Sequence, residues 1–326
     1  MNLLFVSSTY VGDAVLSTGL LRELLRRHPG ARVTVACGKA ALPVFAAAPG
    51  VVRLIGIVKR GKLGHWIDLW RDCVGTVWDV AVDLRGSALL YLLRAKERHV
   101  YRPDPSRAYR LQALAATVGL VDMPQPVAWT SAADAAEAAS LLPPGLPAIT
   151  LGTTGNWRAK TWRPERFAEL ALRLTAEGGP LAGGRLVVLG APGEEAETRP
   201  LIERLPAERT INLVGRTTLA VSAAVLKRAA LHIGIDSSPV YMAAAADIPT
   251  LVLRGPTPGL FGPRRGDLIA PWAPKAAEVT TTETWQELTS PSKAERDAMT
   301  SRMDSLTVDA AEAGAVQLLK RLGEPT

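Results

Sequence analysis

Leu3–Ala36 reads LLFVSSTYVGDAVLSTGLLRELLRRHPGARVTVA and holds a complete strand–helix–strand pattern. The apolar run Leu3–Val6 predicts one buried strand, and RVTVA at Arg32–Ala36 predicts a second. Between them, Gly12–His28 carries leucine and valine near helical spacing, and Pro29-Gly30 ends that helix. Because strands joined by a crossover helix pair in parallel, this stretch predicts a parallel sheet covered by helices.

The same alternation continues along the chain and is interrupted once. Val51–Val58 and Val80–Leu84 predict further strands, and Ser140–Pro147 (SLLPPGLP) predicts a linker, because its prolines and glycine break both helix and strand. After the linker, the expected strands are Ala148–Leu151, Arg185–Leu189, Leu231–Ile235 and Thr250–Leu253, and the expected helices are Pro164–Glu177, Glu194–Leu205, Leu219–Ala229 and Val240–Ala246.

This pattern predicts an α/β protein with two doubly wound parallel-sheet domains facing a central cleft, at residues 1–142 and 146–288. In such folds ligands bind at the carboxyl ends of the strands, so the cleft is the expected site. Residues 289–326 look helical, and we expect them to pack back on the first domain.

The positive charge of the chain lies mainly in its first half. The net charge is +7, and residues 1–140 hold 17 basic and 11 acidic side chains. This excess indicates an anionic partner, such as an acidic glycan, a phosphate, a lipid headgroup or nucleic acid. Alternatively, the basic side chains only lie on solvated helix faces. Nucleic acid is not expected as a partner, since aromatic residues make up 5% of the chain and no known nucleic-acid module occurs. The basic residues concerned are Lys59, Arg60, Lys62, His65, Arg94, Lys96, Arg98, Arg102, Arg107 and Arg110.

Several features of the sequence predict a cytoplasmic protein. Its cysteines, Cys37 and Cys73, have no metal-ligand spacing and suit a reducing compartment. Met1–Val6 does not resemble the start of a signal peptide. The apolar runs are shorter than the roughly 20 residues that a membrane-spanning helix needs, so contact with a membrane would be peripheral.

Polar segments follow three of the expected strands. In Ser7–Leu16 (SSTYVGDAVL), Asp13 is either a first-turn acid favoured by the helix dipole or a general base. Gly152–Pro164 (GTTGNWRAKTWRP) offers hydroxyls and cations that suit a phosphate, and is otherwise a solvated loop. Gly234–Ala246 (GIDSSPVYMAAAA) opens a helix whose free amides can bind an anion, or is an ordinary capped helix.

Other motifs of known chemistry are missing from the sequence. It contains no G-x-G-x-x-G, no P-loop, no D-x-D, no H-E-x-x-H and no G-x-S-x-G. Dinucleotide, metal-assisted and serine-hydrolase chemistry are therefore not predicted. Arg254–Arg265 (RGPTPGLFGPRR) is a stiff loop that either shapes a pocket wall or only connects elements.

In order and spacing, these segments resemble the ADP-heptose:lipopolysaccharide heptosyltransferases, glycosyltransferase family 9, over nearly the whole chain. Ser8 with Gly12–Thr18 is similar to the opening motif of the family, and Lys160–Phe167 is similar to its K-x-W-P-x-x-x-F stretch with Arg163 inserted. The further matching segments are Val187–Gly190, Asn212–Thr217, Asp236-Ser237 and Arg254–Thr257.

The resemblance implies a GT-B fold of two Rossmann-like domains, with acceptor on the first and nucleotide-sugar on the second. It implies inversion at the anomeric carbon without a metal or other cofactor, with ADP-heptose as co-substrate and an acidic glycolipid of lipopolysaccharide-core type as acceptor, at the cytoplasmic face of the inner membrane. Asp13 would be the catalytic base, and Lys160 would act on the donor phosphates. The implied donor-binding residues are Thr153, Thr154, Lys160, Glu194, Glu195, Asp236, Ser237, Ser238 and Tyr241, and the implied acceptor-binding residues are Lys59, Arg60 and Lys62.

The sequence departs from the family in one loop, which usually reads D-[ST]-G-x-x-H. Here Ser238 replaces the glycine and Tyr241 replaces the histidine. A side chain at position 238 limits the approach of the backbone to phosphate, and Tyr241 can donate a hydrogen bond but carries no positive charge. Three alternatives follow: a related transferase with another donor or acceptor, a nucleotide-sugar epimerase or hydrolase, or a non-catalytic binding protein.

Overall fold

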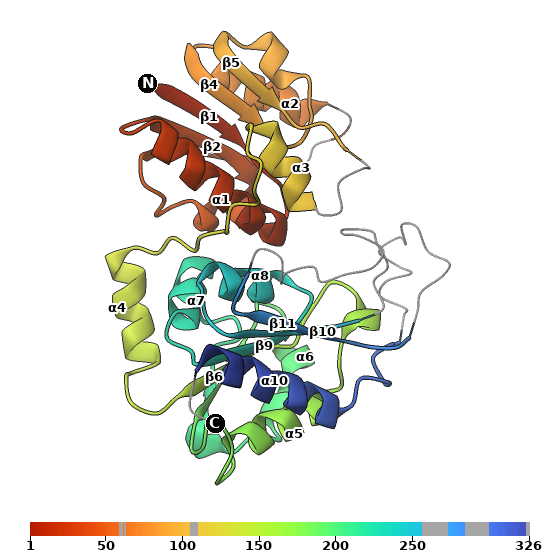
Figure 1. Ribbon diagram of the computed structural model, residues 1–326. Coiled ribbons are helices and arrows are strands. Elements are labelled where there is room, and N and C mark those ends of the chain that lie inside the picture. Colours follow the sequence, from red (N-terminus) through yellow and green to blue (C-terminus); the bar gives the residue numbers. More distant parts are fainter. Residues whose placement is uncertain (59–60, 62, 105–109, 256–272, 284–299, 324–326) are drawn as a thin grey trace. The chain divides into compact units, whose positions relative to one another are not determined.

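The chain folds into two compact units, Met1–Ser131 and Ala132–Thr326 (Figure 1). The structure is a computed structural model that describes residues 1–58, 61, 63–104, 110–255, 273–283 and 300–323. Helix α4 (Ala132–Leu141) packs against α7 (Leu219–Leu226) and so belongs to the second unit. The division therefore precedes α4, and the predicted linker at 140–147 lies within the second unit.

The first unit is built on a five-stranded parallel sheet with the order β3-β2-β1-β4-β5. The four strands predicted here occur within two residues of their expected bounds. Its elements are β1 (Asn2–Val6), α1 (Val11–Arg27), β2 (Arg32–Gly38), the 3₁₀ helix η1 (Lys39–Val44), β3 (Val51–Ile57), α2 (Gly64–Cys73), β4 (Trp78–Asp83), the 3₁₀ helix η2 (Leu89–Leu92), β5 (Ala95–Val100) and α3 (Arg110–Thr117).

The second unit is built on a six-stranded parallel sheet with the order β11-β10-β9-β6-β7-β8. The four predicted strands are again present, and the four predicted helices lie within three residues of their expected bounds. Besides α4 and α7, its elements are β6 (Ala148–Gly152), the 3₁₀ helix η3 (Arg158–Lys160), α5 (Pro164–Thr175), β7 (Arg185–Leu189), α6 (Glu195–Ile202), the 3₁₀ helix η4 (Ala207–Arg209), β8 (Thr210–Asn212), β9 (Leu231–Ile235), α8 (Ser238–Ala245), β10 (Thr250–Arg254), β11 (Ala276–Thr280) and α10 (Val308–Leu322).

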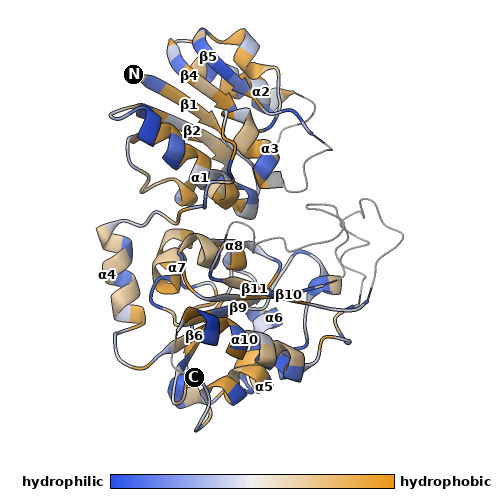
Figure 2. Ribbon diagram, viewed as in Figure 1, coloured by the Kyte–Doolittle hydropathy of each residue, from blue (hydrophilic) through white to orange (hydrophobic). Residues whose placement is uncertain are grey.

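The strands that the sequence analysis missed, β5, β8 and β11, lie at sheet edges. β5 is largely exposed and reads AKERHV, and Figure 2 shows it coloured mainly as hydrophilic. An edge strand has a neighbour on one side only and needs no continuous apolar run, so the hydropathy signal that found the inner strands was absent.

The prediction that the C-terminal segment packs on the first domain is wrong for its described part. Helix α10 packs against α5, β10 and β11 of the second unit. Its apolar side chains join the same buried cluster as Phe167 of α5 and Leu251 of β10. The buried residues of α10 in this cluster are Val308, Ala311, Ala315, Leu318 and Leu319. Because that apolar face complements the sheet of the second unit, burial fixes the tail there.

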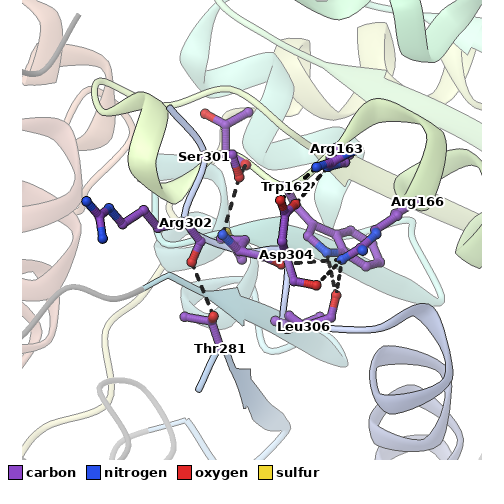
Figure 3. Close-up of polar contacts among 10 residues, drawn as sticks. Trp162, Arg163, Arg166, Thr281, Ser301, Arg302, Asp304 and Leu306 are labelled. Atoms are coloured by element: carbon purple, nitrogen blue, oxygen red, sulfur yellow. Dashed lines mark hydrogen bonds and ion pairs between the residues drawn. The ribbon is translucent and has the colours of Figure 1, made fainter. Parts of the chain in front are cut away.

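The segment before α10 is tied down by polar contacts (Figure 3). Trp162 Nε1 donates to the carbonyl of Leu306 at 2.9 Å, and Arg166 Nη1 donates to the same carbonyl at 2.7 Å. Arg163 forms two 2.7 Å hydrogen bonds with the carboxylate of Asp304. The residues that follow Lys160 in the sequence are therefore held by the C-terminal segment of the chain.

In each sheet the winding direction reverses once. In the first unit the reversal lies between β1 and β4, and in the second it lies between β6 and β9. At such a point the loops leave the sheet on opposite faces, which opens a crevice at the carboxyl ends of the two strands. The segments that follow β1, β6 and β9 are the three polar segments singled out in the sequence.

Candidate functional site

The loops after β6 and β9 pack closely at the reversal point of the second sheet. A Cβ atom on Gly155 would lie 2.9 Å from Cδ1 of Ile235, and one on Gly152 would lie 3.1 Å from Cβ of Pro239. Side chains at these two positions would push the loops apart, so glycine permits the approach. The sequence segments 152–164 and 234–246 thus lie together, as expected.

A buried ion pair joins the two segments. Lys160 Nζ lies 2.9 Å from Asp236 Oδ2, and the two side chains are only 7% and 8% exposed. The hydroxyl of Tyr241 donates to the other carboxylate oxygen, Oδ1, at 2.9 Å. The tyrosine that replaces the family's histidine is therefore a partner of Asp236, and the three residues form one polar network.

The electrostatic surroundings keep Asp236 ionised. Burial by itself raises the pKa of this carboxyl, but the charge and hydrogen bond of Lys160, the hydroxyl of Tyr241 and the nearby charge of Arg254 together hold the pKa below its usual value. The ammonium of Lys160 also lies 5.3 Å from the ring centroid of Trp157. Trp157 and Arg254 lie in segments that the sequence analysis selected, but neither was named there as a binding residue.

The loop after β7 contributes a second cluster. Thr154 Oγ1 donates to Glu194 Oε2 at 2.7 Å, and the backbone amide of Ala191 donates to the same oxygen at 2.7 Å. Thr153 is buried beside Thr154, whereas Glu195 is exposed and lies over the turn at Gly215, where a Cβ would meet its Oε1. Of the two candidate glutamates, Glu194 is the one joined to the loop after β6.

Helix α8 begins directly after Asp236. Ser237 is its N-cap residue but makes no side-chain capping bond, and its hydroxyl oxygen is buried without a partner. Ser238 and Pro239 begin the first turn. Proline has no N–H, and the amide of Val240 donates to the carbonyl of Ser237 at 3.2 Å, so Ser238 supplies the amide that has no partner within the helix. An anion placed here would meet the Ser238 amide, the positive end of the helix dipole and a serine hydroxyl.

His232 lies beneath this site in β9 and was not predicted as a site residue. Its Nδ1 lies 3.0 Å from the hydroxyl oxygen of Thr150, and its imidazole lies against Gly152. Complete burial lowers the pKa of His232 to about 3, although the contact with Thr150 opposes the shift. The imidazole is therefore neutral at physiological pH, and we assign it a packing role.

In the first unit, Asp13 lies in the first turn of α1, after β1. The hydroxyl of Ser8 donates to Asp13 Oδ2 at 3.2 Å, and the carboxylate is only partly buried. Tyr10, the N-cap residue, provides no side-chain cap. Asp13 is therefore held at the carboxyl edge of the sheet by its neighbour Ser8 while part of it faces solvent.

The structure says less about the basic residues predicted to bind the acceptor and about the proline-rich loop after β10. Lys59, Arg60 and Lys62 lie outside the described residues, as does most of Arg254–Arg265. Other basic side chains of the first unit have internal partners: Lys96 pairs with Asp79 at 2.7 Å, and Arg98 donates to two backbone carbonyls. The predicted cleft and the approach of Asp13 to the donor residues remain predictions, because each unit is described by itself.

Within the described ranges, no group of three or more histidine, cysteine or acidic side chains is arranged to hold a metal ion. None of the helices in those ranges is long and apolar enough to span a bilayer.

Comparisons with known proteins agree with this architecture. The chain is 24% identical over 303 residues to lipopolysaccharide heptosyltransferase 2 of Salmonella typhimurium, covering 81% of this chain and 85% of the relative. It is 28% identical over 295 residues to lipopolysaccharide heptosyltransferase 1 of Pseudomonas aeruginosa, covering 80% and 81%. Among solved structures, E. coli ADP-heptose lps heptosyltransferase II has a TM-score of 0.74 at 19% identity, with 99% and 100% coverage. The E. coli heptosyltransferase WaaC with ADP has a TM-score of 0.68 at 18% identity, with 98% and 100% coverage.

Two Rossmann-like parallel-sheet units with these neighbours define the fold as GT-B type. Residues 73–297, well over half of the chain, match the profile of glycosyltransferase family 9 (heptosyltransferase). The chain belongs to this family and is a glycosyltransferase, which confirms the resemblance found in the sequence.

Proposed function

We propose that the protein transfers heptose from ADP-heptose to an acidic glycolipid of lipopolysaccharide-core type, with inversion at the anomeric carbon. The observation that carries the proposal is the buried Lys160–Asp236–Tyr241 network beside the N-terminus of α8, at the reversal point of the second sheet. A cation, the Ser238 amide and the unpartnered Ser237 hydroxyl at such an edge suit a nucleotide diphosphate. The names of the similar heptosyltransferases supply the identity of the sugar and of the acceptor.

On the acceptor side, Asp13 is the proposed general base. An acceptor hydroxyl is a weak nucleophile, so its proton passes to the Asp13 carboxylate as its oxygen attacks the anomeric carbon. Proton transfer of this kind accelerates reactions by about 10²–10⁴-fold. The bond between the anomeric carbon and the diphosphate oxygen breaks in the same step, and its electron pair leaves with the nucleotide.

On the donor side, the protein stabilises the charge that develops on the leaving diphosphate. Lys160 has three N–H donors, one of which bonds Asp236, so two remain for phosphate oxygens. The amide of Ser238 at the start of α8 adds an uncharged donor, and Ser237 adds a hydroxyl. Thr153, Thr154 and Glu194 line the adjoining loop and are proposed to contact the rest of the donor.

The proposal includes three further statements. The reaction uses no metal and no other cofactor, because Lys160 and the N-terminus of α8 supply the positive potential at the diphosphate. Lys59, Arg60 and Lys62 bind the acidic acceptor sugar through their positive charge. The enzyme acts in the cytoplasm at the inner membrane, where it meets its lipid-anchored acceptor through peripheral contact.

The first experiment measures transfer with ADP-heptose and lipopolysaccharide-core acceptor in EDTA, together with the melting temperature in ADP-, UDP-, GDP- and CDP-sugars. We expect a shift with ADP-heptose or ADP, since a ligand of the native state raises the melting temperature, and transfer that EDTA leaves unchanged. Asp13→Asn should bind donor normally and lose at least about 10²-fold in kcat.

Other outcomes would change the proposal. A shift with a different nucleotide would replace the donor but keep the transferase. Consumption of the donor without acceptor would favour hydrolysis or epimerisation. Donor binding without any turnover would favour a non-catalytic relative, and unchanged activity in Asp13→Asn would remove Asp13 as the base.

A further inference from the structure

Arg85 lies at the reversal point of the first sheet, although nothing in the sequence motifs selects it. It follows β4, whose last residue, Asp83, pairs in register with Val6 of β1, and the amide of Leu84 donates to the carbonyl of Val6 at 2.9 Å. The segment that carries Asp13 follows β1. Arg85 and Asp13 therefore belong to the two loops that flank the crevice expected in this unit.

The backbone of the Arg85 loop is fixed. Asp83 is fully buried, and its carboxylate accepts hydrogen bonds from the backbone amides of Arg85 and Ser87, both at 2.8 Å, and from the Ser87 hydroxyl. Gly86 has a φ of +67°, and a Cβ there would lie 2.8 Å from the carbonyl oxygen of Tyr101. Only glycine fits this turn well, so Arg85 projects from a rigid support.

The guanidinium group of Arg85 lies over an aromatic ring, and one of its nitrogens lacks a hydrogen-bond partner. Its Cζ is 4.5 Å from the ring centroid of Trp66 in α2, and its Nη1 is buried without a hydrogen-bond partner. Across the described ranges, Arg85 takes part in no ion pair. Burial lowers the pKa of Arg85 while Asp83 raises it, and arginine remains protonated in proteins at neutral pH.

This arrangement is unfavourable unless a ligand completes it. A buried donor without a partner destabilises the fold, and more strongly when the group is charged. Stacking on Trp66 fixes the plane of the guanidinium and offsets only part of that cost. A carboxylate or phosphate matches the fork of N–H donors and would satisfy Nη1.

We infer that Arg85, stacked on Trp66, forms an oxyanion-binding subsite for a carboxylate or phosphate group of the acceptor. The nature of the acceptor rests on the proposed function, whereas the need of Arg85 for an anion rests on its own geometry. Arg85 is thus a binding residue that distinguishes acidic from neutral acceptors, next to the loop that holds the proposed base.

The test is the affinity of the acceptor in the absence of donor, measured by calorimetry in detergent micelles. Four acceptors are compared: the native acidic core glycolipid, its carboxyl-reduced form, its dephosphorylated form and the form with both changes. The proteins are the wild type, Arg85→Gln and Arg85→Lys. The control variant is Arg71→Gln, which removes an equal charge from α2 at a side chain that is 69% exposed.

We expect the wild type and Arg71→Gln to bind the native acceptor about 10–100-fold more tightly than one of the neutralised forms, the range of a charge-assisted bidentate contact. The form that loses affinity identifies the anion as carboxylate or phosphate. In Arg85→Gln the difference should fall below about 2-fold, and Arg85→Lys should keep part of it, because lysine retains the charge but not the fork. The melting temperature of Arg85→Gln should change little, since Nη1 has no hydrogen bond to lose and relief of its burial offsets the lost stacking on Trp66.

Two results would overturn the inference. One is a preference for the native acceptor that survives in Arg85→Gln, and the other is a wild type that binds all four acceptors equally. A lower melting temperature in Arg85→Gln with an unchanged preference would assign Arg85 a structural role instead. Selective binding without any transfer would refute the proposed function and leave the Arg85 subsite standing.

Discussion

At the scale of single residues, Asp236 joins Lys160 and Tyr241 in the proposed donor site. It bonds Lys160 through one carboxylate oxygen and Tyr241 through the other, and both side chains of the ion pair are almost fully buried. Removing one member of a buried pair leaves a charge without a partner, which costs more than the intact pair contributes. Stability and donor binding should therefore depend on the same three side chains.

Asp236→Asn should lower the free energy of unfolding by about 3–5 kcal/mol at pH 7, because it leaves the ammonium of Lys160 buried without its counter-charge. The double variant Asp236→Asn, Lys160→Met should recover part of the loss. Urea denaturation of the wild type and both variants measures this. A single variant as stable as the wild type would mean that the pair is not maintained in solution.

The deficit of Asp236→Asn should also depend on pH. The native state lowers the pKa of Asp236, so this group stabilises the fold above the ordinary pKa of aspartate, about 4, and the contribution is lost as pH falls through the lower native pKa. Between about pH 5 and pH 7, the free energy of unfolding of Asp236→Asn should lie below that of the wild type by a constant amount. Below about pH 4, this difference should become smaller. A difference that begins to shrink already near pH 6 would contradict the lowered pKa.

Tyr241→Phe should weaken donor binding by about 10-fold or more, because it removes a hydrogen bond to the carboxylate that orients Lys160. Tyr241→His restores the residue that the family motif carries, and we expect it to retain most of the affinity, since imidazole can donate to the same oxygen. Calorimetric titration with ADP measures both variants. Equal affinities for ADP in Tyr241→Phe and wild type would show that the hydroxyl is dispensable.

At the scale of elements, the segment before α10 holds the polypeptide that follows Lys160. Arg166 donates to the backbone carbonyls of Asp304 and Leu306 at 2.8 and 2.7 Å, and it is partly buried. Arg163 and Asp304 form an exposed pair instead, and exposed pairs contribute little because water and salt screen them. Arg166 should therefore contribute much more to the stability of this segment than the neighbouring Arg163.

Arg166→Met should lower the free energy of unfolding by about 1–3 kcal/mol, because two backbone carbonyls lose a charged donor. It should also speed hydrogen exchange at the start of α10. Arg163→Gln is the matched control, and its unfolding curve should overlap that of the wild type in 0.5 M salt, roughly the regime where surface charges are screened. Equal destabilisation by the two variants would mean that the carbonyl contacts do not hold the segment.

At the scale of the whole molecule, the two units have separate sheets, and the residues proposed to bind the donor lie in the second. A ligand protects the amides whose local opening it suppresses. Saturating ADP should therefore slow hydrogen exchange in the loops after β6 and β9 and in α8, and leave the first sheet unchanged. Lys160→Gln should abolish this protection. If ADP slowed exchange in the first unit alone, the nucleotide would bind there, and our assignment of the donor to the second unit would be wrong.

Much of the architecture could be predicted from the sequence. The inner strands and their helices were found because a buried parallel strand is an apolar run of a few residues and its crossover helix has a different period. The edge strands β5, β8 and β11 were missed because one-sided pairing requires no such run. The loops after β6 and β9, which the sequence analysis selected because polar residues follow buried strands there, do lie together at the reversal point of the sheet, and their role as donor site stays a prediction.

The sequence by itself determined the fold class, the family and the segments proposed to form the donor site, because these depend on local periodicity and on the order of short motifs. Only the tertiary structure decided that α10 packs on the second unit, that Tyr241 bonds Asp236, and that Arg85 stacks on Trp66 with a buried, unpaired nitrogen. Each of these depends on which side chain lies opposite in the folded protein. Burial and hydrogen bonding settle such contacts, whether the residues are five positions apart, as Tyr241 and Asp236 are, or far apart in the chain, and neither leaves a pattern in the sequence.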